Sequence, residues 1–536
     1  MKRNEIKKII SLAGVAILCA SLVACSGTGS AVTETENTTE SSEQADEDKA
    51  EGDAPEGEAP EKEAPDSTAP DGEAGEKPEG EAPDGQGGEK PDGEAPDGAA
   101  PGEKPDGAPD GEAPGNPPDG EGGGFGGGGS SADIDYSAST EITSQDTQEG
   151  ETYTSDTADV SALMVSTSDD VTINNATVTK SGDSDGGDNC NFYGLNAAVL
   201  VKDGSTTTIT GGTITSDADG ANGVFSYGGN GGQNGAEGDG TTVVISDTKI
   251  TTTGDGSGGI MTTGGGITKA SDLTVETSGR SSAAIRTDRG GGTVTVDGGT
   301  YTTNGLGSPA IYSTADISVS DATLISNLSE GVCIEGMNSI TLTDCDLTAN
   351  NTDTNGNATF YDSIMIYQSM SGDADSGTST FSMTGGSLTS KNGHVFHVTN
   401  TNAVIELSGV KITNEDSDNI LLSVCADGWS GASNIATLNA DGQDLEGTIL
   451  VGSDSQLTLN LANGSSFEGT IDGNITNAKG DIVSTEVGTV AVSIDEGSTW
   501  TLTADTYISS FDGDASSVVS NGYTLYVDGE ALTGTK

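Results

Sequence analysis

The feature that most constrains this chain is an internal repeat that starts near residue 160. Short strand-like runs, each broken by a tight turn at Gly, Asp or Asn, recur as VTINNATVT (171–179), TTITGGTIT (207–215), VTVDGGTYT (294–302) and ITLTDCDLT (340–348). A second set of runs interleaves with the first, and a β-branched residue anchors each of them at Val199, Val224, Ile260, Ile285, Ile311, Val332, Ile364, Val395 and Ile420. By subtraction of those numbers, consecutive anchors lie 25, 36, 25, 26, 21, 32, 31 and 25 residues apart. Steps of this size without helical periodicity predict one β-coil per repeat, with insertions confined to the corners.

The repeat resembles the right-handed parallel β-helix of the pectin-lyase-like superfamily, across roughly residues 160–480. The resemblance implies an all-β solenoid in which successive coils stack as parallel strands. Elementary packing agrees with it, because one coil cannot bury its inner face alone and neighbours at ~4.8 Å share a continuous core. We therefore predict a right-handed parallel β-helix over 131–490 and a C-terminal β cap over 491–536 that closes the exposed strand edge.

The N-terminus predicts export and a membrane anchor. A basic start (MKRNEIKK) precedes an apolar run that ends in LVAC and is too short for a spanning helix. That ending resembles the bacterial lipobox, which implies cleavage after residue 24 and lipidation of Cys25, and two acyl chains there would give stable anchoring. We expect a lipoprotein signal peptide over 1–24 and a chain that is lipid-anchored at the extracellular face of a bacterial cell membrane. An ordinary signal peptide is the alternative.

Residues 25–130 are predicted to form a lipidated N-terminus and a disordered acidic stalk. Thirty acidic residues and five lysines lie in 31–130, and fourteen of the fifteen prolines fall between Pro55 and Pro118. So few apolar side chains cannot offset the entropy lost on folding, and prolines and like charges keep such a segment extended. The stalk would hold the next domain away from the membrane.

Charge narrows the class of partner. The chain carries a net charge of −65, so it could not neutralise nucleic-acid phosphates, and a polyanionic glycan would be repelled unless divalent cations bridged it. We expect no nucleic-acid partner, and we expect a monomer. Cys19 leaves with the signal peptide, and the cysteines after Cys25 show no CxxC pair, so we expect buried free thiols at Cys190, Cys333, Cys345 and Cys425.

A row of outward-facing side chains on the second set of runs is the candidate site. Because side chains alternate along a strand, the residue after each anchor should face away from the core. Those residues are Leu200, Phe225, Met261, Arg286, Tyr312, Cys333, Met365, Phe396 and Leu421. An outward face this apolar is either covered or used for binding. Long corner loops flank this ladder, and the residues that we expect to bind a ligand are Arg286, Asp288, Arg289, Tyr312, Tyr227, Tyr367, Trp429, Tyr193 and Tyr361.

Two kinds of function remain open at that face, beside a purely structural surface spacer. We favour a non-catalytic, adhesin-like module that binds a glycan or another host or cell surface, with aromatic rings stacking on sugars. The alternative is a polysaccharide lyase or glycoside hydrolase of the β-helix class, which Arg286, Asp288 and Arg289 superficially fit. An arginine base needs unusual help to lose a proton, and no dense aspartate cluster lies on neighbouring coils, so no catalytic residue is assigned. Loops that bury the ladder would weaken both hypotheses.

Two Gly-rich loops could hold Ca²⁺ through oxygen ligands. The segments GDSDGGDN (182–189) and GDADSG (372–377) contain the candidate metal ligands Asp183, Asp185, Asp188, Asp373 and Asp375, although neither has EF-hand spacing. Solvated turns are the alternative, and no other cofactor is expected. His394 and His397 lie three apart in one run, so we expect them to point to opposite faces and not to share a metal.

Overall fold

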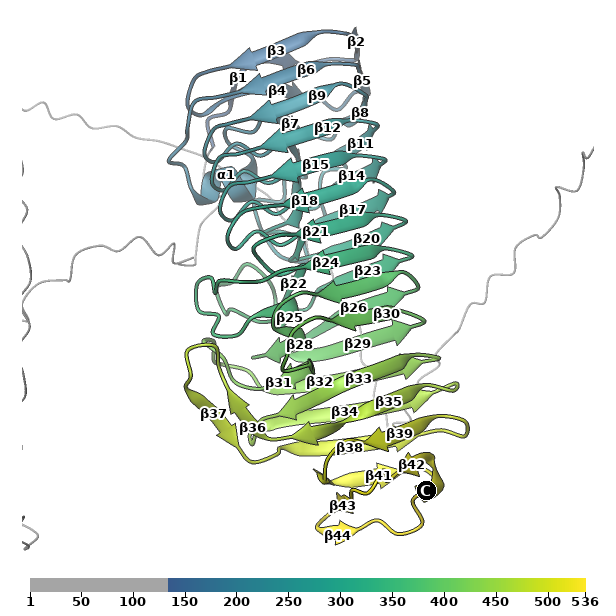
Figure 1. Cartoon of the computed structure of the whole chain (residues 1–536). Coiled ribbons are helices and arrows are strands. Elements are labelled where there is room, and N and C mark those ends of the chain that lie inside the picture. The colour runs from purple at the N-terminus through teal and green to yellow at the C-terminus, as the bar shows by residue number, and fades with distance from the viewer. Residues whose placement is uncertain (1–133) are drawn as a thin grey trace, which may run out of the picture. The chain divides into compact units, whose positions relative to one another are not determined.

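The computed structural model describes residues 134–536. The predicted signal peptide, Cys25 and the acidic stalk lie outside the described residues. The described chain is a right-handed parallel β-helix, as its repeat predicts (Figure 1). Its 44 strands are accompanied by one six-residue α-helix, α1 (Asp188–Tyr193), and a 3-10 turn at Ala515–Ser517. No helix within residues 134–536 is long and apolar enough to cross a membrane.

Three long parallel sheets form the walls of the solenoid, and each strand pairs with a strand one coil away. Sheet A comprises β1 (Ser137–Ile142), β4 (Val160–Ser166), β7 (Val199–Lys202), β10 (Val224–Tyr227), β13 (Ile260–Thr263), β16 (Ile285–Thr287), β19 (Ile311–Ser313), β22 (Val332–Glu335), β25 (Asp362–Tyr367), β28 (His394–Thr399), β31 (Ile420–Val424), β33 (Asp444–Val451), β35 (Ser466–Asp472), β39 (Thr499–Leu502) and β42 (Val518–Val519). Sheet B comprises β2 (Asp146–Glu149), β5 (Val171–Asn174), β8 (Thr206–Thr210), β11 (Thr242–Ser246), β14 (Gly266–Ser271), β17 (Gly292–Asp297), β20 (Asp316–Ser320), β23 (Ser339–Thr343), β26 (Thr378–Thr384), β29 (Asn402–Ser408), β32 (Asn434–Asp441), β34 (Ser455–Ala462), β38 (Thr489–Ile494) and β41 (Ser510–Asp512). Sheet C comprises β3 (Thr152–Ser155), β6 (Thr177–Lys180), β9 (Thr213–Ser216), β12 (Lys249–Thr252), β15 (Thr274–Thr277), β18 (Thr300–Thr303), β21 (Thr323–Ser326), β24 (Asp346–Ala349), β27 (Ser387–Ser390) and β30 (Lys411–Asn414).

The turn between sheets B and C repeats the tight-turn signature of the sequence. Its first residue has a left-handed backbone, with φ from 50 to 53°, at Asn175, Asp247, Asp272, Asp321 and Asp344. Asn and Asp tolerate this conformation better than other non-glycine residues. In the TTITGGTIT coil, Gly212 has φ 84°, and a Cβ there would lie 2.1 Å from the carbonyl oxygen of Ala176. A side chain at Gly212 would therefore clash with the backbone of the adjacent turn.

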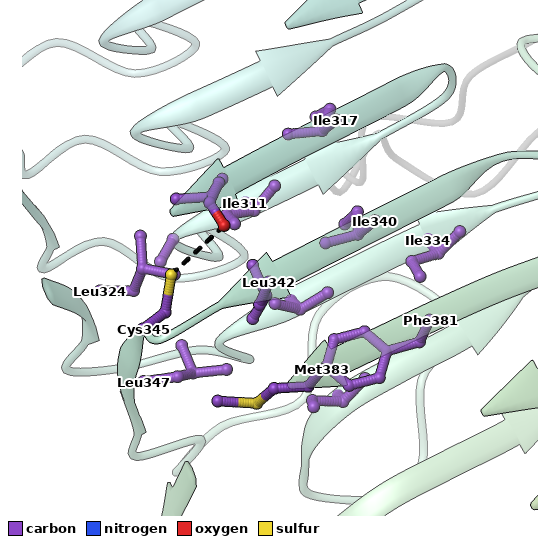
Figure 2. Close-up of a cluster of buried hydrophobic side chains, with 14 of the residues drawn as sticks. Ile311, Ile317, Leu324, Ile334, Ile340, Leu342, Cys345, Leu347, Phe381 and Met383 are labelled. Atoms are coloured by element: carbon purple, nitrogen blue, oxygen red, sulfur yellow. Dashed lines mark hydrogen bonds between the residues drawn. The ribbon is translucent and has the colours of Figure 1, made fainter. Parts of the chain in front are cut away.

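Inward-facing aliphatic side chains stack in rows down the inside of the coils. Figure 2 shows part of this core, where sheets A, B and C and the turn between B and C contribute Ile311, Ile317, Leu324, Ile334, Ile340, Leu342, Cys345, Leu347, Phe381 and Met383. Burial of each Leu or Ile side chain stabilises the fold by about 1.5–3 kcal/mol. The Sγ of Cys345 lies 3.5 Å from the carbonyl oxygen of Val319. All four cysteines of the described chain are buried and free, which confirms that prediction.

Sheet C ends sooner than its neighbours. Its last strand is β30, whereas sheets A and B run on to β42 and β41. The antiparallel hairpin of β36 (Asn474–Thr476) and β37 (Ile482–Thr485) projects from the side of the solenoid (Figure 1). The segment predicted as a cap supplies the last strands of sheets A and B together with a small sheet of β40 (Thr506–Ile508), β43 (Leu525–Val527) and β44 (Glu530–Ala531).

Candidate functional site

The outward face of sheet A carries the predicted ladder, and its register is as expected over seven strands. Strand pairing aligns Leu200, Phe225, Met261, Arg286, Tyr312, Cys333 and Met365. The next rungs are His397 and Ser423, so the expectation of Phe396 and Leu421 at this face is wrong. Ile364 pairs with Phe396 and not with Val395, which makes this coil one residue longer than the anchors suggest and places Phe396 in the core.

A second hydrophobic cluster covers the first rungs of the ladder. Leu200, Phe225 and Met261 are completely buried among residues from α1 and the adjoining loops. Tyr193 and Tyr227, which we expected to bind a ligand, belong to this cluster, and their ring centroids lie 5.8 Å apart in an edge-on contact. Both tyrosines are less than 10% exposed, so their rings serve as packing surface that seals a loop onto the sheet.

Arg286 is the first polar rung, and it is only 6% exposed. Its Nη2 lies 2.5 Å from Oδ2 of Asp288, which is also buried. Burial raises the pKa of Asp288 to about 6, although the charge of Arg286 opposes the shift. The guanidinium also donates to the carbonyl oxygen of Ser281 at 3.2 Å and to Oδ1 of Asn191 at 3.3 Å, and it lies over the ring of Tyr312. These contacts hold Arg286 as an enclosed ion pair.

Arg289 forms a second ion pair at the adjoining corner. Its Nε and Nη2 reach the same oxygen of Asp373, at 3.1 and 2.6 Å, and Ser371 donates to the other oxygen at 2.8 Å. The guanidinium carbon also lies 4.3 Å from the ring centroid of Phe192 in α1. Partial burial and the nearby carboxylate of Asp373 raise the pKa of Asp188. Arg289 therefore ties loop 368–377 to α1.

Glu335 is the centre of the next set of contacts, and it was not among the predicted residues. Its Oε2 accepts hydrogen bonds from the hydroxyls of Tyr312 at 2.6 Å and Tyr367 at 3.1 Å, and Ser369 donates to its Oε1. Burial and the Glu335 carboxylate raise the pKa of each tyrosine well above the usual range of a tyrosine hydroxyl. Tyr367 contacts Trp429, with ring centroids 4.9 Å apart. All three rings are half-buried, so they form an aromatic row that still reaches solvent.

A pocket of about 280 Å³ is formed by the loops next to this row. It is lined by uncharged residues, which are Gln368, Ser376, Gly377, Asn400, Thr401, Asn402, Ala432, Ser433 and Ile435. The buried side chain of Asn400 joins the two loops, because its amide donates to the carbonyl oxygen of Gln368 at 2.6 Å and accepts the N–H of Ala432 at 2.7 Å. Loops 368–377 and 425–433 thus present a neutral, polar hollow, which we call the loop pocket.

The predicted calcium ligands are not gathered. Among residues 134–536, no group of three or more His, Cys, Asp or Glu side chains is placed to hold a metal ion. Asp183 accepts a hydrogen bond from the N–H of Asp219, Asp373 is ion-paired, and Asp185 and Asp375 are exposed. Calcium binding stays a prediction, with no site geometry to support it.

Two histidines come together where the ladder meets loop 351–361. The Nδ1 atoms of His394 and His397 lie 2.7 and 2.8 Å from Oγ of Ser423, so the expectation that they point to opposite faces is wrong. Strand β28 begins at His394, directly after a left-handed corner at Gly393, and strict alternation does not yet apply there. Burial lowers the pKa of His394 to about 3, and the neighbouring His397 adds to the shift. Tyr361 lies at this corner, away from the aromatic row, and its carbonyl oxygen accepts the N–H of His394.

Asp427 completes this buried cluster. Its Oδ2 lies 3.4 Å from Nε2 of His397, and both side chains are fully buried. The ring of Phe360 covers His397 and His394, at centroid distances of 4.7 and 5.4 Å. Serine, histidine and aspartate follow one another here as in a hydrolase triad. Phe360 covers these side chains, however, and we interpret the cluster as buried packing beneath loops 351–361 and 425–433.

Comparison of the chain with protein-family models, with curated proteins and with solved structures finds no match. Inference of function therefore rests on the geometry of the loops on sheet A.

Proposed function

We propose that this protein is a surface lipoprotein whose β-helix binds an uncharged glycan at the loop pocket, without catalysing a reaction. One observation carries the proposal: a pocket lined by neutral amides and hydroxyls is formed by the loops that also carry Trp429 and adjoin Tyr367. Sugars offer hydroxyl groups that bond to such amides, and apolar faces that pack on aromatic rings.

Charge favours an uncharged ligand. Residues 131–536 contain 54 acidic and 11 basic residues, a net charge of −43, which would repel an acidic glycan. The two arginines that could have bound a sugar carboxylate, Arg286 and Arg289, are already paired with Asp288 and Asp373. Because Arg286 is buried in its ion pair with Asp288, a polysaccharide lyase or hydrolase site at Arg286 has less support than glycan binding at the loop pocket.

The N-terminal sequence supports display of this module. The predicted lipid at Cys25 would hold the chain on the extracellular face of a bacterial membrane, and residues 25–130 would carry the β-helix outward. A binding module gains from such a spacer, because its partner lies on another surface.

A glycan array probed with this protein tests the proposal. We expect signals on neutral glycans, and Trp429→Ala should weaken binding about tenfold, which corresponds to about 1.4 kcal/mol. Tyr523→Ala is the matched control, because it removes a 42% exposed aromatic ring near the C-terminus. Signals confined to acidic glycans would contradict the argument from the neutral pocket. No signal at all would sink glycan binding and leave an adhesin that binds protein.

A further inference from the structure

The third wall of the β-helix has an unfinished edge. Sheet C stops at β30, and the next coil passes directly from β32 to β33 through Gly442 and Gln443. A slot of about 670 Å³ lies beyond β30, which we call the edge slot. Strand β30 lines one side of it, and Asp444–Glu446 of β33 line the other. The first half of β33 pairs with β35 and not with β30, so a rung of the sheet is missing at this point.

Main-chain groups of β30 alternate between its neighbour β27 and the edge slot. Those of Lys411 and Glu415 face β27, because their N–H groups donate to carbonyl oxygens on that side at 3.1 and 2.8 Å. Ile412 and Asn414 therefore direct their N–H and C=O groups into the slot. In the described part of the chain, these four groups have no partner. Unpaired main-chain groups along a strand edge are a template for another strand.

Gln443 shows how this edge can be satisfied. Its Oε1 accepts the N–H of Val410 at 2.7 Å, and its Nε2 donates to the carbonyl oxygen of Val410 at 2.8 Å. A carboxamide has the donor and acceptor of a peptide group, so this side chain pairs with one residue of the edge as a neighbouring strand would. Nε2 also donates to the carbonyl oxygen of Asp444 at 2.7 Å, which bridges both walls at one end of the slot.

The opposite wall offers a second strand edge. The carbonyl oxygen of Gln443 accepts the N–H of Ser466 from β35 at 3.0 Å, so alternation turns the main-chain groups of Asp444 and Glu446 toward the slot. Main-chain groups of both walls therefore face into the edge slot.

Charge indicates what kind of segment fits. The exposed carboxylates of Asp444, Glu446 and Glu468 line the edge slot, and Lys411 is the one basic side chain in its lining. We propose that the edge slot binds an extended, basic peptide segment of a partner protein, which completes sheet C by pairing with β30. The acidic residues 31–130 of this chain do not match that chemistry, because they carry 30 acidic side chains against five lysines.

Synthetic peptides added to the full chain test the slot. Fluorescence anisotropy should detect binding of labelled Lys-Val-Lys-Val-Lys-Val-Lys. Methylation of the three valine nitrogens should weaken binding at least tenfold, because it removes N–H donors and keeps every charge. Replacement of the lysines by glutamates should abolish binding. Equal binding of the methylated and unmethylated peptides would overturn the proposal, since charge alone would then explain it, and absence of binding would overturn it as well.

Variants of the two walls locate the binding. Ile412→Pro removes a slot-facing N–H and leaves the hydrogen bonds to β27, so it should weaken binding about tenfold with the circular dichroism spectrum unchanged. Glu446→Gln with Glu468→Gln should weaken binding about threefold at low salt. Glu276→Gln, an exposed carboxylate on β15, is the matched control and should have no effect. Self-association that Ile412→Pro abolishes would make a second copy the occupant, and would refute the basic-peptide proposal.

Discussion

Acid should destabilise the buried packing around His394, beneath loops 351–361 and 425–433. The size of the effect follows from the surroundings of the His394 ring. The ring packs against Phe360, and its Nδ1 lies 2.7 Å from Oγ of Ser423. Burial lowers the pKa of His394 from 6.5 to about 3. Between these two values the unfolded chain binds a proton that the folded chain does not. The free energy of unfolding therefore falls as the pH falls.

Each pH unit inside that window removes about 1.4 kcal/mol. From pH 6.5 to 4.5 the loss is about 2.7 kcal/mol at most, and we expect about 2 kcal/mol because part of the ring reaches solvent. Buried acids act in the opposite direction. Burial raises the pKa of Asp288 to about 6, and it raises the pKa of Asp362 and of Glu330. Protonation of these acids therefore increases the free energy of unfolding as the pH falls. The contribution of His394 therefore has to be measured as a difference between two proteins.

The comparison is between the parent and His394→Asn, which keeps a polar group near Ser423 and cannot titrate. Both proteins carry Trp500→Phe, which leaves Trp429, on the same loop as Asp427, as the only tryptophan. Urea unfolding followed by its fluorescence at pH 7.5 and 4.5 should show that the parent loses about 2 kcal/mol more than the variant.

A packing control separates protonation from loss of contacts. Ile475→Val removes a methylene from the same buried cluster as Phe360, and should cost about 0.5–1.5 kcal/mol equally at both pH values. Equal losses in the parent and in His394→Asn would refute the reasoning, because His394 would then take up its proton at an ordinary pKa in the folded chain.

Three other changes test the packing and the ion pairs. Arg286→Met should cost about 3–5 kcal/mol in urea unfolding, because it leaves Asp288 buried without a partner, and adding Asp288→Asn should restore most of the loss; no recovery would mean that the ion pair is not the cause. Gly212→Ala should lower the thermal midpoint sharply, since its Cβ would lie 2.1 Å from a backbone oxygen. Gly150→Ala, also at positive φ but with open space around it, should cost only about 1 kcal/mol, and similar losses at both sites would contradict the steric argument. A thiol reagent should modify Cys190, Cys333, Cys345 and Cys425 only after denaturation, because each is buried and burial raises the pKa of each thiol. Labelling of the folded chain would contradict this and would show that a covering loop opens.

The β-helix could be predicted because its signals are local. Strand alternation recurs in each repeat, and the tight turn that follows contains either Asp or Asn, as at Asp247, or a pair of glycines, as at Gly212. Register failed where these signals became ambiguous. Val395 and Phe396 are both apolar and both buried, so alternation could not choose which of them continues the row from Ile364.

The candidate site was less predictable, because loops decide it. Tyr193 and Tyr227 became packing surface through α1, and no local pattern in the sequence shows which loop folds over which rung. Arg289 and Asp373 meet although 84 residues separate them. Glu335 accepts hydrogen bonds from Tyr312 on the preceding coil and Tyr367 on the following coil, which only the stacking of strands brings together.

The three arginines beyond residue 3 gain one explanation from this arrangement. Arg280 donates to Oδ1 of Asn355 in loop 351–361 at 2.9 Å, Arg286 contacts Asn191 in α1, and Arg289 binds Asp373 in loop 368–377. One coil therefore holds three separate insertions against sheet A. In a domain with a net charge of −43, acidic loops would otherwise repel one another, and a planar guanidinium can hold each of them through several fixed donors. Within the stack, the core strands of each coil pack against those of the adjacent coils, so ligand chemistry can vary in the outer loops while the core beneath them stays unchanged.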